Sequence, residues 1–340
     1  MKTVLDSLNA ALNQAMTEDE RVYLIGEDLL DPYGGAFKVS RGLSTKYPER
    51  VLSSPISEAA ITGLAGGMAL RGLRPVVEIM FGDFTTLIAD QLINSIAKFR
   101  WMYNDQVSVP LVIRSPMGGR RGYGPTHSQS IEKLFLGVPG LRTLAPTNLD
   151  DPGELLLQAI SQDEGPVFFV ENKLQYLQKL FDPAAAPDFQ LQRYTLPYTY
   201  APLYSLSIQG APPPSLTLVT YGYMSELVRE TMLRLAYENE IFCELLVPTQ
   251  LSPFGEDDNL PTPLLDSLRR TGHLLTIEEG TLTLGWGAEV LARASQALGT
   301  SLKTAQRVAA AETPIPASIA QEEASLPQVE DIIQAARKMV

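Results

Sequence analysis

Cysteine is nearly absent from this sequence, since Cys243 is the only one in 340 residues. A single thiol excludes a disulfide within the chain and any metal site built from several cysteines. Histidine is almost as rare, because only His127 and His273 occur. They stand far apart, so the short His and Cys spacings typical of zinc sites are missing too.

Long apolar runs are also missing, because no stretch approaches the roughly 18 apolar residues that a membrane-spanning helix needs. Positive charge is scarce as well: 27 Lys and Arg stand against 39 Asp and Glu, a net charge of −12. Phosphate binding needs clustered Lys and Arg, so this balance argues against a nucleic-acid partner. Residues 1–22 have the apolar spacing of an amphipathic helix and lack the pattern of a secretory signal. We therefore expect no membrane contact and a cytoplasmic location.

What the sequence does contain is an alternation of apolar strands with helical patterns, typical of α/β folds with parallel sheets. Hydrophobic residues make up 45% of the chain, enough for two ordinary cores. We predict a first doubly wound domain over residues 1–181. Its expected strands are 22–25, 74–80, 109–114, 141–145 and 165–171, and its expected helices are 57–70, 84–102, 129–137 and 151–162.

A second α/β pattern follows a proline-rich stretch. Residues 182–214 have no long helical period and predict an extended linker with one or two edge strands. Residues 215–340 then predict a second doubly wound domain with an amphipathic helix at its end. The expected strands are 216–222, 242–248 and 273–279, and the expected helices are 224–238, 261–271, 287–298 and 326–339.

Two glycine clusters resemble parts of nucleotide-binding motifs. The cluster at 63–67 lies inside a helical pattern, and the one at 285–290 lacks the third glycine of GxGxxG. No GxxxxGK[ST] loop is present. Close packing of backbone explains both clusters better than phosphate binding, so the chain has no evident phosphate cradle of its own.

Glu58 is a lone carboxylate at the start of a segment of small and apolar residues. One interpretation is an exposed acid in the first turn of a helix, where the helix dipole favours negative charge. The other is a buried carboxyl that exchanges a proton with a ligand, because burial disfavours the bare anion. Glu27, like Glu58, follows an apolar strand, and ligands of parallel sheets bind at that end.

His127 ends a loop that contains Gly118, Gly119, Gly122 and Gly124. A loop histidine is either solvated or catalytic, and the sequence alone does not choose. The neighbouring Arg120 and Arg121 are either exposed or positioned to receive a carboxylate.

Several motifs together carry a family resemblance. They are GED (26–28), YGGAFKVSRGL (33–43), the run from Pro55 to Phe84, DQLINSIAKFRWM (90–102), PLVIRSPMGG (110–119), HSQS (127–130), VPGLRTLAPTN (138–148), LVTYG (218–222), EEG (278–280), GWGAEV (285–290) and LPQVEDI (326–332). In this order, over residues 3–335, the chain resembles the beta subunit of thiamine-diphosphate-dependent 2-oxo-acid dehydrogenases. Pyruvate, acetoin and branched-chain enzymes all belong to that family, whose fold is a transketolase-like pyrimidine-binding domain followed by a transketolase C-terminal-like domain.

The resemblance implies roles for single residues. It places Glu58 against the N1′ atom of the cofactor's aminopyrimidine, with Ile56, Met80 and Phe84 as apolar neighbours of that ring. His127 corresponds to a histidine that assists substrate binding and acyl transfer to a lipoyl group. Glu27 and Asp90 correspond to acids of a polar tunnel between two cofactor sites. A potassium site of some members corresponds to Leu111, Ala159, Ile160 and Asp163, although the segment here is one residue longer.

The resemblance also implies partners. Family members divide thiamine diphosphate between subunits: an alpha subunit holds the diphosphate and Mg²⁺, and the beta subunit holds the pyrimidine. We therefore expect an α2β2 heterotetramer that acts with a lipoyl-bearing acyltransferase. Two segments depart from the family pattern, WMYNDQ (101–106), which lacks two glycines, and the arginine-containing loop MGGRRGYGPT (117–126). The second departure makes a substrate with another anionic group plausible, with Arg120 and Arg121 as its receptors.

Other functions stay open at this point. A ketol-transfer or acyloin-type thiamine enzyme would differ in its acceptor, and a non-catalytic assembly subunit would keep the fold without the chemistry. Retention of Glu58, Phe84 and His127 argues against the latter. A nicotinamide-dependent dehydrogenase is disfavoured by the missing glycine fingerprint. The sequence does not identify the 2-oxo acid or the acyl acceptor.

Overall fold

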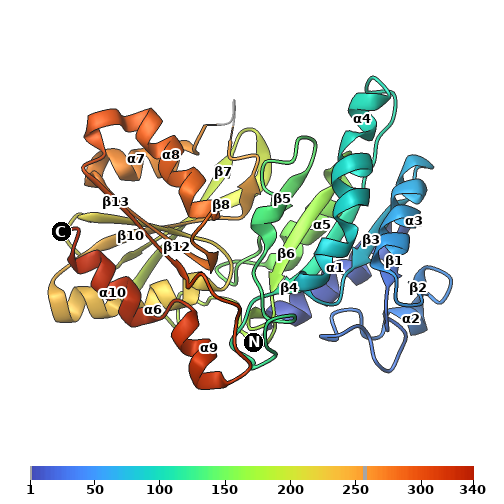
Figure 1. Ribbon diagram of the computed structural model, residues 1–340, viewed down its shortest axis with the longest axis horizontal. Helices are drawn as coiled ribbons and strands as arrows, with labels where there is room; N and C mark the ends of the chain where they lie inside the picture. Colours follow the sequence, from blue (N-terminus) through green and yellow to red (C-terminus); the bar gives the residue numbers. More distant parts are fainter. Residues whose placement is uncertain (1, 256–258) are drawn as a thin grey trace. The chain divides into compact units, whose positions relative to one another are not determined.

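The computed structural model describes residues 2–255 and 259–340 (Figure 1). The chain folds into two compact units. The first consists of Met1–Gly118 and Leu134–Leu180, and the second of Gly119–Lys133 and Phe181–Val340. Each unit contains a sheet with helices on both faces, so the predicted α/β class is confirmed. None of the helices within the described ranges is both long and apolar enough to cross a membrane.

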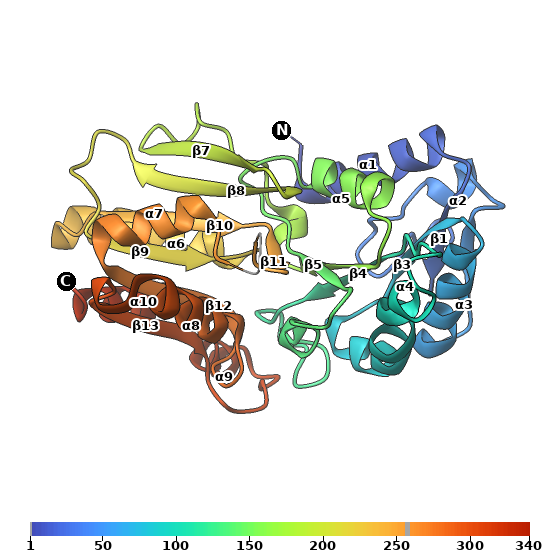
Figure 2. The same cartoon turned by 90° about the horizontal axis from the view of Figure 1, so that it is seen from above.

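In the first unit, a parallel sheet has the strand order β5-β6-β4-β3-β1-β2. Helices α1 and α5 cover one face and α3 covers the other (Figure 2). The strands are β1 (Val22–Gly26), β2 (Val51–Ser53), β3 (Arg74–Glu78), β4 (Val112–Met117), β5 (Arg142–Leu144) and β6 (Val167–Asn172). The helices are α1 (Val4–Glu18), α2 (Leu43–Lys46), α3 (Glu58–Leu70), α4 (Phe99–Met102) and α5 (Pro152–Gln162).

The core of this unit explains why its strands read as continuous apolar runs. Val76, Val77, Ile113, Phe168 and Phe169 are fully buried, because a sheet covered by helices on both faces hides successive side chains. The first helix begins as its sequence indicates: the Thr3 hydroxyl accepts from the Asp6 backbone N–H, and the Asp6 carboxylate accepts from the Thr3 N–H. This reciprocal cap satisfies two otherwise unpaired donors.

In the second unit, the strand order is β13-β12-β9-β10-β8-β7. The first four strands are parallel, and the β7–β8 hairpin extends the sheet antiparallel to β10. Helices α7 and α8 lie on one face, and α6 and α10 on the other (Figure 1). The strands are β7 (Phe189–Leu196), β8 (Thr199–Ile208), β9 (Leu216–Thr220), β10 (Cys243–Pro248), β11 (Gln250–Ser252), β12 (His273–Thr281) and β13 (Thr304–Ala310). The helices are α6 (Met224–Asn239), α7 (Thr262–Thr271), α8 (Trp286–Leu298), α9 (Ile319–Ser325) and α10 (Val329–Arg337).

The stretch expected to be a linker is instead part of this sheet. Residues 189–208 form the β7–β8 hairpin, and β8 is an internal strand whose central residues are buried. Proline suggested an extended connection, but Pro197 lies at the turn between the strands, outside both hydrogen-bonded ladders. The linker interpretation of 182–214 therefore needs correction: the segment is structural, although the expected edge strand, β7, is present.

Two expected helices differ from the structure. Residues 82–102 are helical but irregular, passing through a 3-10 helix η1 (Gly82–Ile88), a π-helix η2 (Asp90–Ser95), a 3-10 helix η3 (Ile96–Lys98) and α4. Residues 129–137 contain only the 3-10 turn η4 (Glu132–Leu134). The apolar residues there do not share one helix face, because the chain changes unit at residue 134 and Gly137 adopts a φ of +76°.

Candidate functional site

Three residues predicted for the site follow three neighbouring strands of the first unit. Glu27 comes directly after β1, Glu58 follows β2 within five residues, and Met80 follows β3. These strands are parallel and adjacent in the order β3-β1-β2, so their carboxyl ends meet at one edge of the sheet. That edge is where parallel α/β sheets bind ligands.

Glu58 is the first residue of α3 and is only 6% exposed. The interpretation of Glu58 as an exposed surface acid is therefore wrong. In the parts of the chain that the structure describes, no hydrogen-bond donor contacts its carboxyl group. A buried carboxyl group without an internal donor is available to a hydrogen-bond donor of a ligand.

Glu27 lies beside Glu58 and is 5% exposed. Its carboxylate accepts a hydrogen bond from the backbone N–H of Ser57, with 3.2 Å between Glu27 Oε1 and Ser57 N. Burial raises the pKa of Glu27, and repulsion from Glu58 raises it further. The two acids are thus close enough for the charge of Glu58 to affect Glu27.

Apolar and aromatic side chains lie near this edge of the sheet. Phe84 is half-buried in η1 and packs edge-on against Phe81, with ring centroids 5.9 Å apart. Met80 is half-buried, and Ile56 is 83% exposed two residues before Glu58. An exposed isoleucine beside a buried, unpartnered carboxyl fits a flat heterocycle that presents a ring nitrogen to the acid. The role of Ile56, Met80 and Phe84 as neighbours of an aminopyrimidine stays a prediction.

Asp90, the other acid expected in the polar tunnel, is exposed at the start of η2. Its carboxylate accepts a hydrogen bond of 2.8 Å from the Asn94 side chain. In this chain Asp90 is therefore a surface residue, and its tunnel role stays a prediction.

The sequence reasoning missed a buried charge network in the same unit. Arg114 is 1% exposed and forms ion pairs with Glu78 and, at 2.6 Å, with Glu171. Ser40 donates to Glu78 at 2.8 Å, and Tyr176 donates to Glu171. Burial alone would lower the pKa of Arg114, but the two carboxylates raise it. One signal was available: each of these charged residues interrupts an apolar strand run, at 78, 114 and 171.

The residues expected to bind potassium surround a side chain instead. The Arg74 guanidinium donates to the carbonyl oxygens of Ile160 (2.9 Å) and Asp163 (3.0 Å), and Arg74 pairs with Glu164 at 2.6 Å. The Asp163 carboxylate pairs with Arg142 at 3.1 Å. The carbonyl groups at the end of α5 thus already face an internal cation. This arrangement disfavours the expected potassium site at Leu111, Ala159, Ile160 and Asp163.

The loop that carries His127 belongs to the second unit, although it lies between β4 and β5 in the sequence. His127 is half-buried, and its Nδ1 atom lies 3.0 Å from the Thr126 hydroxyl. Nearby, Arg120 Nη2 donates to the Pro327 carbonyl at 2.6 Å, and its Nε lies 3.8 Å from Glu279. The Arg120 guanidinium also lies over the Tyr223 ring. Arg120 is therefore tied into the fold, which disfavours its expected role as a receptor for substrate, whereas Arg121 is half-buried.

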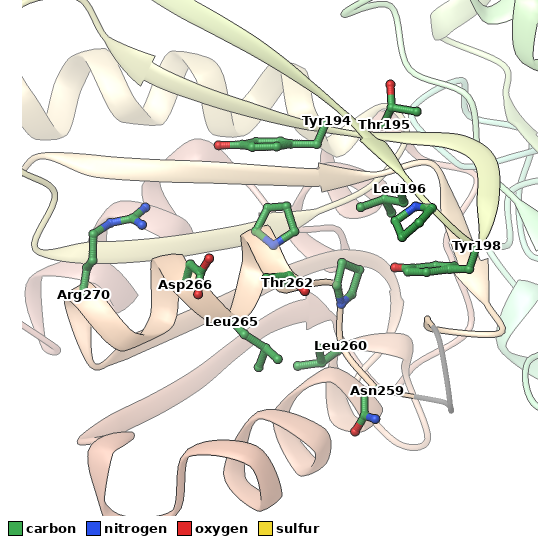
Figure 3. Close-up of a pocket in the computed structure, with 13 residues that line it drawn as sticks. Tyr194, Thr195, Leu196, Tyr198, Asn259, Leu260, Thr262, Leu265, Asp266 and Arg270 are labelled. Atoms are coloured by element: carbon green, nitrogen blue, oxygen red, sulfur yellow. The ribbon is translucent and has the colours of Figure 1, made fainter.

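A separate cavity of about 560 Å³ lies within the second unit, between the β7–β8 turn and α7 (Figure 3). Tyr194 and Tyr198 come from the hairpin, and Asp266 and Arg270 from α7. None of the site residues expected from the sequence lines this cavity. Within the described ranges, no group of three His, Cys, Asp or Glu side chains is arranged to hold a metal ion.

Two domain families match the chain. The transketolase pyrimidine-binding domain matches residues 1–178, and the transketolase C-terminal domain matches residues 209–332. The chain is 36% identical to the mitochondrial pyruvate dehydrogenase E1 component subunit beta-1 of Arabidopsis thaliana, covering 99% of this chain and 88% of that protein. It is 34% identical to the mitochondrial subunit beta of the human enzyme, covering 99% and 90%.

Two further matches widen the comparison. The acetoin:2,6-dichlorophenolindophenol oxidoreductase subunit beta of Cupriavidus necator is 33% identical, with 98% of this chain and 95% of that protein covered. A solved structure described as a split gene transketolase, inactive beta4 tetramer, superposes with a TM-score of 0.72 at 19% identity. The superposition covers 100% of this chain and 98% of that one. At that identity, the likeness concerns the fold alone.

Proposed function

Because the chain belongs to the family of transketolase-like beta subunits of pyruvate and acetoin dehydrogenase E1 components, we propose the following function. It is the beta half of a thiamine-diphosphate-dependent enzyme that decarboxylates a 2-oxo acid and passes the acyl group to a lipoyl group. The observation that carries the proposal is the buried, unpartnered carboxyl of Glu58 at the start of α3, with Glu27 beside it.

The residues of the first unit have separable tasks in this proposal. Ile56, Met80 and Phe84 present an apolar surface to the aminopyrimidine ring. Glu58, buried at the start of α3, would hold the N1′ atom of that ring by a hydrogen bond. Glu27 lies next to Glu58, and burial and the charge of Glu58 raise the pKa of Glu27. Thiamine diphosphate, when bound, supplies the electron sink for the loss of CO₂.

A partner is part of the proposal. The sequence has no phosphate cradle, and the glycine-rich loop after β4 is occupied by groups of the chain itself, as described below. An alpha subunit would hold the diphosphate and Mg²⁺ in an α2β2 heterotetramer, and a lipoyl-bearing acyltransferase would receive the acyl group. Curated relatives from plants and human carry the word mitochondrial in their names, so the cytoplasmic location of this chain stays a prediction.

A second candidate from the same chemistry is an acyloin-type enzyme, favoured by the 33% identity to an acetoin oxidoreductase subunit. The two differ in acceptor and share the Glu58 site. An assay of the reconstituted enzyme with and without a lipoyl domain separates them.

The test is reconstitution. The chain is co-expressed with a candidate alpha subunit, and dye reduction is measured with acetoin and with pyruvate, branched-chain and dicarboxylic 2-oxo acids, in the presence of thiamine diphosphate and Mg²⁺. We expect Glu58→Gln to lower the turnover by at least about 100-fold, because proton transfer at N1′ is lost. Glu49→Gln, an exposed acid of the same unit, is the matched control. Full activity of Glu58→Gln, or of the chain without its partner, would overturn the proposal.

A further inference from the structure

The loop between residues 119 and 124 has the backbone of an anion-binding nest. Arg120 and Gly122 both have a φ of +67°, and Gly124 has a φ of +77°. Left-handed residues in close succession turn several backbone N–H groups toward one point, and such concave sites bind anions. Arg120 adopts this conformation although its side chain makes it costly, so contacts elsewhere must hold the loop in place.

The anion in this nest comes from the chain itself. Glu322 in α9 is fully buried, and its two carboxylate oxygens accept from the backbone N–H groups of Arg120 (2.8 Å) and Gly122 (2.7 Å). Glu279 at the end of β12 accepts from the N–H of Gly119 at 2.7 Å. Three backbone donors of the loop are thus satisfied by two buried carboxylates, which leaves the nest unavailable to a phosphate.

Packing around Glu322 makes this contact specific. A side chain added at Gly119 would place its Cβ 2.7 Å from Leu326 Cδ1 and 3.1 Å from Glu322 Oε1, so both side chains would have to shift. Leu326 belongs to a buried cluster with Ala310 and Ile315, which holds the end of α9 in the fold. The loop therefore meets a fixed surface.

The other end of the loop is fixed in the same unit. Glu132 accepts from the Tyr221 hydroxyl, and the Lys133 ammonium donates to the Thr283 carbonyl at 2.6 Å. His127 lies between these two anchored ends of the segment, and its Nδ1 atom is 3.0 Å from the Thr126 hydroxyl. The position of His127 therefore depends on the contacts that fix the two ends of this segment.

We propose that Glu322 is a positioning residue: its carboxylate fills the nest of the loop 119–124 and fixes the loop that presents His127 for acyl transfer. The structural half of this inference stands on the contacts of the second unit. The catalytic half rests on the proposed function, because it assigns His127 a part in that reaction.

The structural half is tested by hydrogen exchange on the purified full-length chain. In Glu322→Gln, the side-chain NH₂ group replaces one of the two carboxylate oxygens and cannot accept the hydrogen bond from the backbone N–H that it faces. Peptides covering 118–128 should therefore exchange at least about ten-fold faster. Glu323→Gln, an exposed neighbour on α9, should leave these peptides unchanged. Unchanged exchange in Glu322→Gln would overturn the inference. Should that variant not fold, Gly122→Ala strains the same loop without altering either carboxylate, and it should produce the same local increase.

The catalytic half is tested by a mutant cycle with His127. Lipoyl-dependent turnover of Glu322→Gln should fall about ten- to a hundred-fold, because a misplaced loop loses the geometry of the reacting groups. Affinity for thiamine diphosphate should not change. If Glu322 acts through His127, the double variant His127→Ala/Glu322→Gln is no slower than His127→Ala alone. A double variant at least about ten-fold slower would show that Glu322 acts otherwise and would overturn this half.

The two proposals fail in different ways. A wild-type complex that decarboxylates no 2-oxo acid would refute the proposed function. The exchange experiment would still decide whether Glu322 holds the loop.

Discussion

In the first unit, Glu27 and Glu58 follow β1 and β2, and Glu58 keeps a carboxyl group without an internal donor among the described residues. In the second unit, Glu278 and Glu279 lie near the end of β12 and both accept from backbone N–H groups of the protein. The comparison shows that two related α/β architectures use strand-end acids differently. In the first unit, Glu58 is available to a ligand. In the second unit, Glu279 binds the loop at Gly119, and Glu278 binds the start of α8 at Gly287.

A third group of acids in the first unit resembles those of the second. Glu78 and Glu171 are both buried, at 4% and 1% exposed, but Arg114 forms ion pairs with both. An acid at a strand end is therefore not by itself a sign of a ligand site. What distinguishes Glu58 is burial without an internal partner.

The largest effect on stability should come from Arg114→Met. The substitution leaves two buried carboxylates uncompensated, so we expect the free energy of unfolding to fall by about 3–5 kcal/mol. Arg100→Met, which breaks an exposed pair with Asp105, is the control and should cost less than about 1 kcal/mol. Urea denaturation measures both. If both substitutions lower the free energy of unfolding by the same small amount, the buried ion pairs of Arg114 are no more important for stability than a surface ion pair.

The buried carboxyl group of Glu278 should make the free energy of unfolding depend on pH, by an amount of similar size. Burial raises its pKa to about 7. The folded state then binds a proton more tightly than the unfolded chain, so stability from this group is present at acid pH. It is lost as the pH rises through the window from the usual value near 4.5 to about 7.

Glu278→Gln should remove this loss. Relative to wild type, the variant should gain about 2–3 kcal/mol between pH 5 and pH 8, because glutamine stays neutral while still accepting from the Gly287 N–H. Denaturation curves at both pH values provide the measurement, with the exposed Glu289→Gln as control. A pH-independent difference between Glu278→Gln and wild type would mean that Glu278 is already ionised when buried.

Arg74→Met tests the internal cation at the end of α5. Losing the bonds to the Ile160 and Asp163 carbonyls should cost about 1–3 kcal/mol, since buried acceptors are left unpaired. The exposed Arg71→Met is the control. Exchanging Na⁺ for K⁺ at constant ionic strength should not change the melting temperature of wild type. A rise specific to K⁺ would restore the potassium site expected from the sequence.

The smallest effect concerns Arg121, the remaining candidate receptor for an anionic substrate. In the reconstituted enzyme, Arg121→Ala should raise KM by up to about ten-fold for dicarboxylic 2-oxo acids and leave KM for pyruvate unchanged. Arg337→Ala, on the exposed side of α10, is the control. A change shared by all substrates would contradict a role in charge recognition.

Much of the fold could be predicted because the signals were local. The apolar runs at β1, β3, β6 and β12 and the helical periods at α1, α5, α6 and α8 lie within a residue or a few of the expected ranges. Where prediction erred, the pattern was weak or broken. Pro197 obscured the β7–β8 hairpin, and the helix expected over 129–137 is only the short 3-10 turn η4.

The candidate site was predictable in part. Glu58 stood out in the sequence as a single acid among small residues, and the structure adds that it is buried and lies beside Glu27. Arg114 and Glu171 were visible as charges inside apolar strands, but their pairing depends on strand order, which no local pattern encodes. The same holds for Arg74, whose carbonyl partners lie more than 80 residues away in the chain.

The sequence by itself therefore determined the elements, the α/β class and the acid at the start of α3, because each depends on neighbouring residues and their period. Only the tertiary structure decided which charges are satisfied. It brought Arg74 to the end of α5, Arg114 between two acids, and Glu322 to a loop 200 positions away from it in the sequence. Burial and pairing are properties of distant segments in contact, and such contacts are settled when the whole core packs.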